Sequence, residues 1–234
     1  ADRVAWLWLL AEPIAHVALL VWVRTLAGSL RIVAGAEFIP WLVIGVTLFI
    51  MFRNQMNRGM EAIAANRGLF AYRQVQPVDT VLARCGLEGA LSTIVLSLMI
   101  FLFSLLGHNV VPHHPMVVLH IWGIVWAFGM GVALIFSVVV TSLPEAGKFI
   151  RMLMFPLYFL SGILIPVQYF PHDLQQYLLY NPMLHAVELI RTGFFETYRA
   201  VDGVSALYLH QWVWGSVFLG LLLQLRFKQR LLAQ

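Results

Sequence analysis

Three side chains near the end of the sequence are spaced so that they could act together. His185, Glu188 and Arg191 recur every third residue, so on a helix each can pair with its neighbour along one face. A structural ion pair is the ordinary interpretation of this spacing. Because the Asn181-Pro182 step interrupts a helix, we expect two short helices here, re-entrant or at the membrane surface.

Two stretches approach the motifs of hydrolases but lack a required residue. A zinc protease helix carries His-Glu-x-x-His, and the stretch from His185 to Glu188 has no second histidine. A serine nucleophile turn is Gly-x-Ser-x-Gly, and the run that begins at Gly203 ends in Leu207. An intramembrane enzyme remains an alternative, although no motif supports it.

A second polar stretch is rich in histidine: His108, His113, His114 and His120. Histidine is a frequent metal ligand, but Pro112 and Pro115 make this stretch irregular, and no cysteine or carboxylate is near it in the sequence. Adjacent histidines are also poor ligands for one ion. We therefore expect no metal site.

Glu12 and His16 lie one helical turn apart within a hydrophobic run. A carboxylate within a membrane is costly unless it faces a partner or water, so the pair has a structural and a functional interpretation. A proton-coupled carrier would need such groups, and Glu12, Glu88 and Glu188 are the available ones. That class also remains open.

The composition indicates an integral membrane protein. Hydrophobic residues make up 61% of the chain, and charged residues 11%, whereas soluble domains typically carry about 25% charged residues. The mean hydropathy is +0.82. With this composition, the net charge of +4 reflects topology and contact with anionic lipid, and it gives no reason to expect nucleic acid as a partner.

The sequence predicts an all-α membrane protein with one transmembrane domain over residues 1–234 and six transmembrane helices. A helix of about 20 apolar residues crosses a bilayer, and the candidates are residues 4–23, 38–58, 80–106, 116–141, 150–167 and 205–226. Polar stretches occupy residues 59–78 and 168–203. Because the sequence begins without methionine, we expect a preceding cytosolic segment.

Basic residues are retained on the cytoplasmic side of a membrane protein. If the first span runs outward, both termini and residues 59–78 are cytoplasmic, and residues 168–203 are external. Most of the 15 lysines and arginines then lie on the cytoplasmic side. Only four lie on the other: Arg24, Arg31, Arg191 and Arg199.

The cytoplasmic stretch has the character of a docking element. Two Asn-Arg-Gly triplets, at residues 57–59 and 66–68, bracket a short amphipathic helix from about Met60 to Arg67. An aromatic and basic tail with Phe70 and Tyr72 follows. The alternative is a plain loop whose arginines only fix the topology.

Several separated motifs, in the same order along the chain, resemble those of the ABC-type permeases that export capsular polysaccharide. The cytoplasmic loop of that family is similar to residues 65–73 with 77–80 and 83–84, its first span to 8–13, its fifth to 155–162, and the segment before its last helix to 181–191. The sequence departs from the family at its start, where an arginine-rich amphipathic helix is nearly all missing.

This resemblance implies a homodimer in the bacterial inner membrane that pairs with two ATPase subunits and moves a lipid-linked, usually acidic polysaccharide outward. Periplasmic co-polymerase and outer-membrane export proteins are further expected partners. The chain itself should hold no cofactor, since the ATPase binds ATP and magnesium. Gly147-Lys148 indeed lacks the phosphate-loop pattern, because Phe149 follows it and Ser142 replaces the first glycine. Other glycans, of the O-antigen or teichoic acid type, and an intramembrane enzyme that modifies lipid-linked glycans remain alternatives.

The resemblance also assigns expected roles to residues. The coupling helix that contacts the ATPase would involve Glu61, Asn66, Arg67, Gly68, Leu69, Phe70, Tyr72 and Arg73. Aromatic rings and arginines suit a sugar and phosphate path, for which the candidates are Trp41, Arg53, Arg58, Arg84, Phe155, Tyr158, Phe159, Tyr169 and Phe170. Each arginine could instead anchor a lipid headgroup. An outer gate would comprise Asn181, Pro182, His185, Glu188 and Arg191.

Overall fold

The computed structural model describes residues 14–22, 32–72 and 74–232, and most of these are helical. The helices are residues 14–22, α2 (Phe38–Met60), α3 (Ala62–Ala65), α4 (Pro77–Leu105), α5 (Pro115–Ser142), α6 (Ala146–Leu160), α7 (His172–Leu178), α8 (Pro182–Phe194), α9 (Ala206–Arg226) and α10 (Lys228–Leu232). Two 3-10 turns are η1 (Arg67–Ala71) and η2 (Val167–Tyr169). The strands β1 (Ile32–Val33) and β2 (Ala36–Glu37) form a small antiparallel hairpin.

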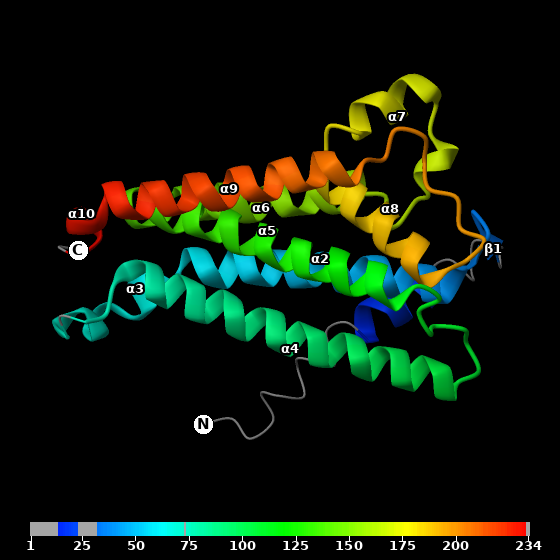
Figure 1. Ribbon diagram of the computed structural model, residues 1–234, viewed down its shortest axis with the longest axis horizontal. Coiled ribbons are helices and arrows are strands. Elements are labelled where there is room, and N and C mark those ends of the chain that lie inside the picture. The colour runs from blue at the N-terminus through cyan, green and yellow to red at the C-terminus, as the bar shows by residue number, and fades with distance from the viewer. Residues whose placement is uncertain (1–13, 23–31, 73, 233–234) are drawn as a thin grey trace.

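The long helices run side by side along the molecule (Figure 1). We call the end with α3, η1 and α10 the α3 end, and the opposite end, with the hairpin, α7 and α8, the α7 end. In the most apolar 18-residue stretch of α2, 83% of the residues are buried, whereas the share in the corresponding stretch of α9 is 17%. Helix α2 is therefore the central helix, and the apolar outer faces of α4, α5 and α9 are suited to lipid.

Four helices in the described part of the chain are long and apolar enough to cross a membrane: α2, α4, α5 and α9. They correspond to four of the six predicted spans. Of the predicted span 4–23, the structure describes only residues 14–22. The full six-span topology therefore remains a prediction.

The predicted span 150–167 is helical only to Leu160. Helix α6 has 15 residues and contains Pro156, so it is about 22 Å long, less than the roughly 30 Å of a hydrocarbon core. Gly162 adopts a positive φ of 68°, which ends the helix in a conformation that glycine tolerates well. Hydropathy alone did not reveal this stop because residues 161–165 remain largely apolar.

Small residues let α5 and α9 pack closely, as is common between membrane helices. A Cβ atom on Gly131 would lie 2.5 Å from the Ser216 Oγ and 2.7 Å from the Val217 nitrogen. Across the same interface, the buried Gln224 amide donates a hydrogen bond of 2.7 Å to the Ser137 hydroxyl. The contact thus depends on both close approach and a buried polar pair.

We expect Gly131→Ala to lower the free energy of unfolding by about 1–3 kcal/mol, because the added methyl overpacks the interface. Gly123→Ala on the same helix is the matched control, since nothing lies within 4 Å of its added Cβ. That change should be neutral or stabilise by up to about 1 kcal/mol through helix propensity. Thermal unfolding in detergent measures both, and equal effects would contradict the packing argument.

Candidate functional site

Arg191 is fully buried at the α7 end and has partners from three parts of the chain. Its Nη1 donates to the Gly162 carbonyl at 2.9 Å and to the Glu188 Oε1 at 3.2 Å. Its guanidinium also lies over the Trp41 ring, 3.6 Å from the centroid. The guanidinium fits beside α2 because residue 45 is glycine. A Cβ atom at this position would lie only 2.7 Å from the Arg191 Nη2.

The carboxylate of Glu188 extends this network to the chain that follows α8. It accepts hydrogen bonds from the Tyr198 hydroxyl at 2.8 Å and from the Val201 nitrogen at 3.3 Å. The Trp41 indole donates to the same Tyr198 hydroxyl at 3.4 Å. Burial raises the pKa of Tyr198, so its hydroxyl keeps the proton that it donates. We call Trp41, Glu188, Arg191 and Tyr198 the Arg191 network.

His185 fixes the two connections that flank α8. Its Nδ1 accepts a hydrogen bond of 2.9 Å from the Ser205 nitrogen, so the proton is on Nε2, which donates to the Leu179 carbonyl at 2.7 Å. Burial lowers the pKa of His185, which favours this neutral form. The expected pairing of His185 with Glu188 is not what the structure has, because their side chains bond in different directions.

Asn181 and Pro182 begin α8 as the sequence predicts. The Asn181 side chain caps the helix by accepting from the Met183 nitrogen at 2.9 Å. Its amide donates to the Leu160 carbonyl at 3.2 Å and the Ser161 hydroxyl at 3.0 Å, so it also ties α8 to the end of α6. Four of the five predicted gate residues, Asn181, His185, Glu188 and Arg191, thus hold the α7 end together, and Pro182 starts α8. A gating role for them remains a prediction.

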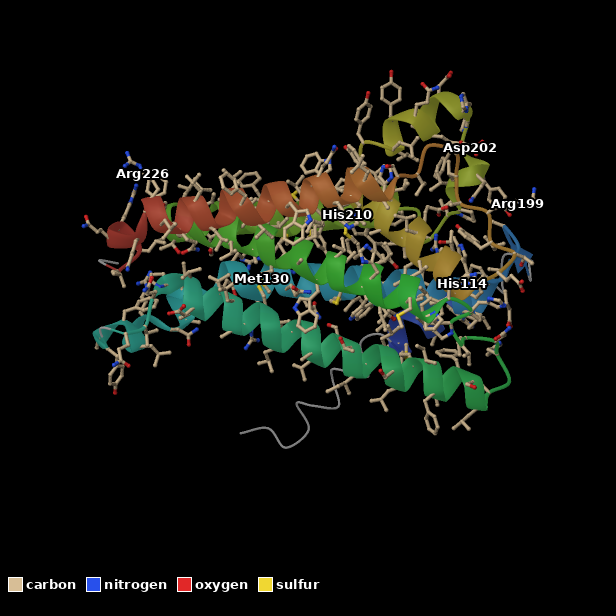
Figure 2. The ribbon with its side chains drawn as sticks, in the orientation of Figure 1. His114, Met130, Arg199, Asp202, His210 and Arg226 are labelled. Carbon is tan, nitrogen blue, oxygen red and sulfur yellow. The ribbon has the colours of Figure 1, made fainter. Side chains whose placement is uncertain are left out.

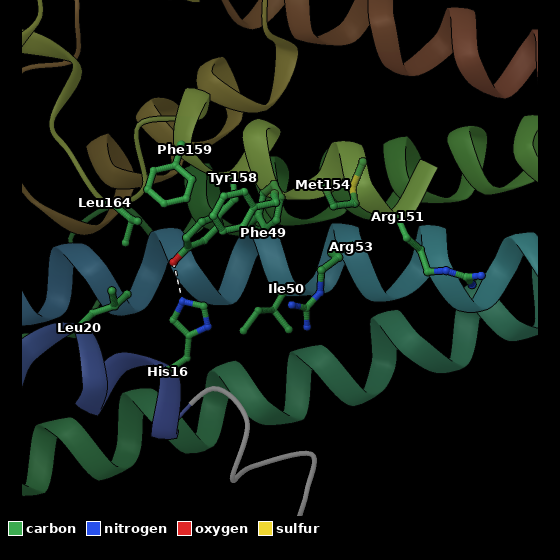
Figure 3. A pocket seen from close by; sticks show the side chains of 11 residues that line it. His16, Leu20, Phe49, Ile50, Arg53, Arg151, Met154, Tyr158, Phe159 and Leu164 are labelled. Carbon is green, nitrogen blue, oxygen red and sulfur yellow. Dashed lines mark hydrogen bonds between the residues drawn. The ribbon is translucent and has the colours of Figure 1, made fainter. Parts of the chain in front are cut away.

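A groove opens between the helix of residues 14–22, α2 and α6 (Figure 3). Its volume is about 370 Å³, and it is lined by His16, Leu20, Phe49, Ile50, Arg53, Arg151, Met154, Phe155, Tyr158, Phe159 and Leu164. We call it the α2–α6 groove. The Tyr158 hydroxyl and the His16 Nε2 lie 2.8 Å apart and join two of its walls. The walls are otherwise mostly apolar and aromatic, with Arg53 and Arg151 toward one end.

The structure brings together only some of the predicted conduit residues. Arg53, Phe155, Tyr158 and Phe159 line the groove, with His16 from the predicted polar pair. Glu12 lies outside the described residues. Trp41 belongs to the Arg191 network, and Tyr169 and Phe170 lie in and just after η2 at the α7 end.

The other two conduit arginines flank a carboxylate. Arg58 and Arg84 lie 3.4 Å and 2.9 Å from the Oε1 of the buried Glu88. Because Arg58 is on α2 and Glu88 on α4, the first of these pairs joins the two helices. Glu88 was not predicted as their partner, although its i,i+4 spacing from Arg84 is a usable signal. Nor were Ile50, Arg151 and Met154 predicted as groove residues.

The predicted coupling helix is divided into two short pieces. Helix α3 has four residues and η1 has five, with Asn66 between them. Ala62 and Ile63 are buried in a cluster with residues of α4, α5 and α10, whereas Leu69 and Tyr72 are 45% and 68% exposed. Arg67 and Gly68 are also exposed, and Arg73 lies outside the described residues. Glu61, at the start of this segment, forms an ion pair with Arg151.

In the part of the chain that the structure describes, no group of three potential metal ligands occurs. Along the sequence, no carboxylate is near the histidine-rich stretch. In the folded chain, the His108 Nδ1 lies 2.5 Å from the Glu37 Oε1, and the His113 Nε2 lies 3.2 Å from the Glu196 Oε2.

We expect Arg191→Ala to lower the free energy of unfolding by about 3–5 kcal/mol, because it leaves the Glu188 charge buried without its partner. Arg199→Ala is the control, since Arg199 is exposed at the same end (Figure 2), and its effect should stay within about 0.5 kcal/mol. Denaturation of the detergent-solubilised protein measures both. Equal stability of the two variants would contradict a stabilising role for the buried Arg191.

Comparison with known proteins places this arrangement in a family. The chain matches the ABC-2 type transporter family over residues 3–195. It is 34% identical to the polysialic acid transport protein KpsM of Escherichia coli, over 94% of this chain and 85% of that protein. It is 30% identical to the capsule polysaccharide export inner-membrane protein CtrC of Neisseria meningitidis serogroup A, over 83% and 73% respectively. It is 28% identical to the corresponding protein BexB of Haemophilus influenzae, again over 83% and 73%. As its motifs predicted, the chain belongs to the ABC-2 type transporter family.

Proposed function

We propose that the chain is the permease subunit of an ATP-driven exporter that moves lipid-linked capsular polysaccharide outward across the bacterial inner membrane. The observation that carries this proposal is the similarity, along nearly the whole chain, to transport and export proteins of polysialic acid and capsule. Four long apolar helices agree with a role within the membrane. Export of another cell-surface glycan, of the O-antigen or teichoic acid type, is the closest alternative.

In this proposal, energy comes from a separate ATPase that binds ATP and magnesium. We place its contact at the α3 end, on the exposed face formed by Arg67, Gly68, Leu69 and Tyr72. A buried anchor supports this face, because Ala62 and Ile63 hold the segment against α4, α5 and α10. A short element that is exposed on one side and anchored on the other can transmit a rigid-body displacement.

We place the polysaccharide path in the α2–α6 groove. Its aromatic rings offer faces to sugar C–H groups, and Arg53 offers a positive charge to a phosphate or an acidic sugar. The outer face of α6 carries a row of exposed apolar side chains: Phe149, Met152, Leu153 and Phe155. In the proposed homodimer, this face would meet a second copy of the chain and close the groove into a conduit.

The remaining assignments follow the same proposal. Six helices cross the membrane, and both termini and the α3 end lie in the cytoplasm. The α7 end faces the periplasm, where co-polymerase and outer-membrane export proteins receive the polymer. Helix α8, with the Asn181-Pro182 step at its start, forms the outer gate. An intramembrane enzyme acting on lipid-linked glycans and a proton-coupled carrier are the rivals, and neither predicts a bound ATPase.

The first test combines Arg67→Glu with Tyr72→Ala and follows recovery of the ATPase in affinity purification from the native host. Exposed arginine and tyrosine side chains often dominate protein interfaces, so recovery should fall by about tenfold or more. The matched control combines Arg226→Glu with Tyr177→Ala, which changes the same residue types at other exposed positions. A wild-type chain that purifies alone yet modifies a lipid-linked sugar would overturn the exporter proposal.

The second test reverses one charge in the groove. Arg53→Glu should reduce export of an acidic polymer by about tenfold or more, since it replaces attraction by like-charge repulsion, while ATPase binding should persist. Arg226→Glu makes the same charge change at the α3 end, outside the groove, and should leave export near the wild-type rate (Figure 2). Unchanged export in Arg53→Glu would remove the groove from the path.

A further inference from the structure

Helix α6, which forms one wall of the groove, is tied to the rest of the protein by side-chain contacts along its length. At the α3 end, its Arg151 forms an ion pair with Glu61. Near its last turn, the Tyr158 hydroxyl and the His16 Nε2 lie 2.8 Å apart. At the α7 end, the carbonyl of Leu160 accepts a hydrogen bond from Asn181. Movement of α6 relative to these partners must therefore strain or break one of the contacts.

The contact at the α3 end joins α6 directly to the coupling segment. Glu61 lies between the last residue of α2, Met60, and the first residue of α3. Beside the ion pair, Ile150 packs in a small buried cluster with Met56 and Met60. Together these contacts place the start of α6 against the start of the coupling segment, through one charged and one apolar attachment.

Arg151 also lines the α2–α6 groove, beyond Arg53 (Figure 3). One turn further along α6, Met154 and Phe155 line the same groove, and Tyr158 and Phe159 follow on the next turn. A displacement of Glu61 that carries Arg151 with it would therefore shift side chains that line the groove. No other described carboxylate is paired with the Arg151 guanidinium.

We propose that the Glu61–Arg151 ion pair is the joint that transmits movement of the coupling segment to α6 and so changes the width of the groove. The inference rests on the proposed function and assigns Arg151 a positioning role within it. Both side chains are about half exposed, at 54% and 45%. Such a pair contributes little to stability, but it can couple two elements that must also separate and rejoin.

The test is a charge-reversal cycle in the complex of the full chain with its ATPase, with export measured per ATP hydrolysed. Glu61→Arg and Arg151→Glu should each lower this ratio by about fivefold, the largest effect usual for a partly exposed pair. The double variant restores the pair and should return to within about twofold of wild type. Export and hydrolysis are normalised to the amount of complex in the membrane.

An ion pair at the start of the same helix, between Lys148 and the N-cap residue Glu145, supplies matched controls. Lys148 and Glu145 lie 3.0 Å apart and are 76% and 69% exposed. Lys148→Glu makes the same charge change as Arg151→Glu, three residues away, and Glu145→Arg makes the same change as Glu61→Arg. Both controls should keep the wild-type ratio of export to hydrolysis.

The outcomes separate the inference from the proposed function. A wild-type complex that holds no ATPase would reject the proposed function itself. With the ATPase bound, a double variant as defective as the worse single variant would overturn the joint, as would single variants that behave like the controls. If a reversed charge lowers the amount of protein, Glu61→Gln, Arg151→Gln and their combination complete the same cycle. Independent effects of the two neutral changes would then reject the joint.

Discussion

The rest of the α7 end depends on the burial of one positive charge. A guanidinium out of contact with water is tolerated only when ion pairs and hydrogen bonds compensate for its lost hydration. Arg191 is compensated by Glu188 on its own helix, by the carbonyl of Gly162 and by the ring of Trp41. These partners come from α8, the turn after α6, and α2. The interactions of the Arg191 side chain therefore fix the positions of these three segments relative to one another.

This requirement also accounts for local features that would otherwise be unrelated. The backbone turns sharply at Gly162, whose carbonyl accepts from Arg191, so α6 ends where the buried charge needs an acceptor. Gly45 leaves the space on α2 that the guanidinium occupies. At the α3 end, by contrast, the ion pair of Glu61 with Arg151 is about half exposed. The charge at the α7 end is thus buried and held by several partners, whereas this one ion pair at the α3 end is easier to break.

The sequence predicted the parts of this fold that depend on local pattern. The lengths of the uncharged runs located α2, α4, α5 and α9, and the Asn181-Pro182 step located the start of α8. The spacing of Glu188 and Arg191 predicted their ion pair. The end of α6 was missed because it depends on a positive φ and on an acceptor for Arg191, and neither has a hydropathy signal.

The candidate site was predicted less completely, since its contacts join residues distant in the chain. Trp41 was expected on the conduit because it is aromatic, but its place beside Arg191 depends on the approach of α2 to α8. Arg58 and Arg84 were expected to face substrate, yet they share the buried Glu88. The coupling helix was expected over eight residues, but α3 has only four, anchored by Ala62 and Ile63.

The most direct measurement of the central claim is ATP-dependent transport in sealed, inverted inner-membrane vesicles that contain this chain and its ATPase. Lipid-linked capsular polysaccharide is supplied outside, and a glycan-degrading enzyme is added after ATP. If the chain is the export permease, the polymer becomes protected only when ATP is hydrolysed, and a non-hydrolysable analogue abolishes the protection. Polymer that remains fully accessible with the ATPase bound and active, or that is chemically altered without crossing, would contradict the account.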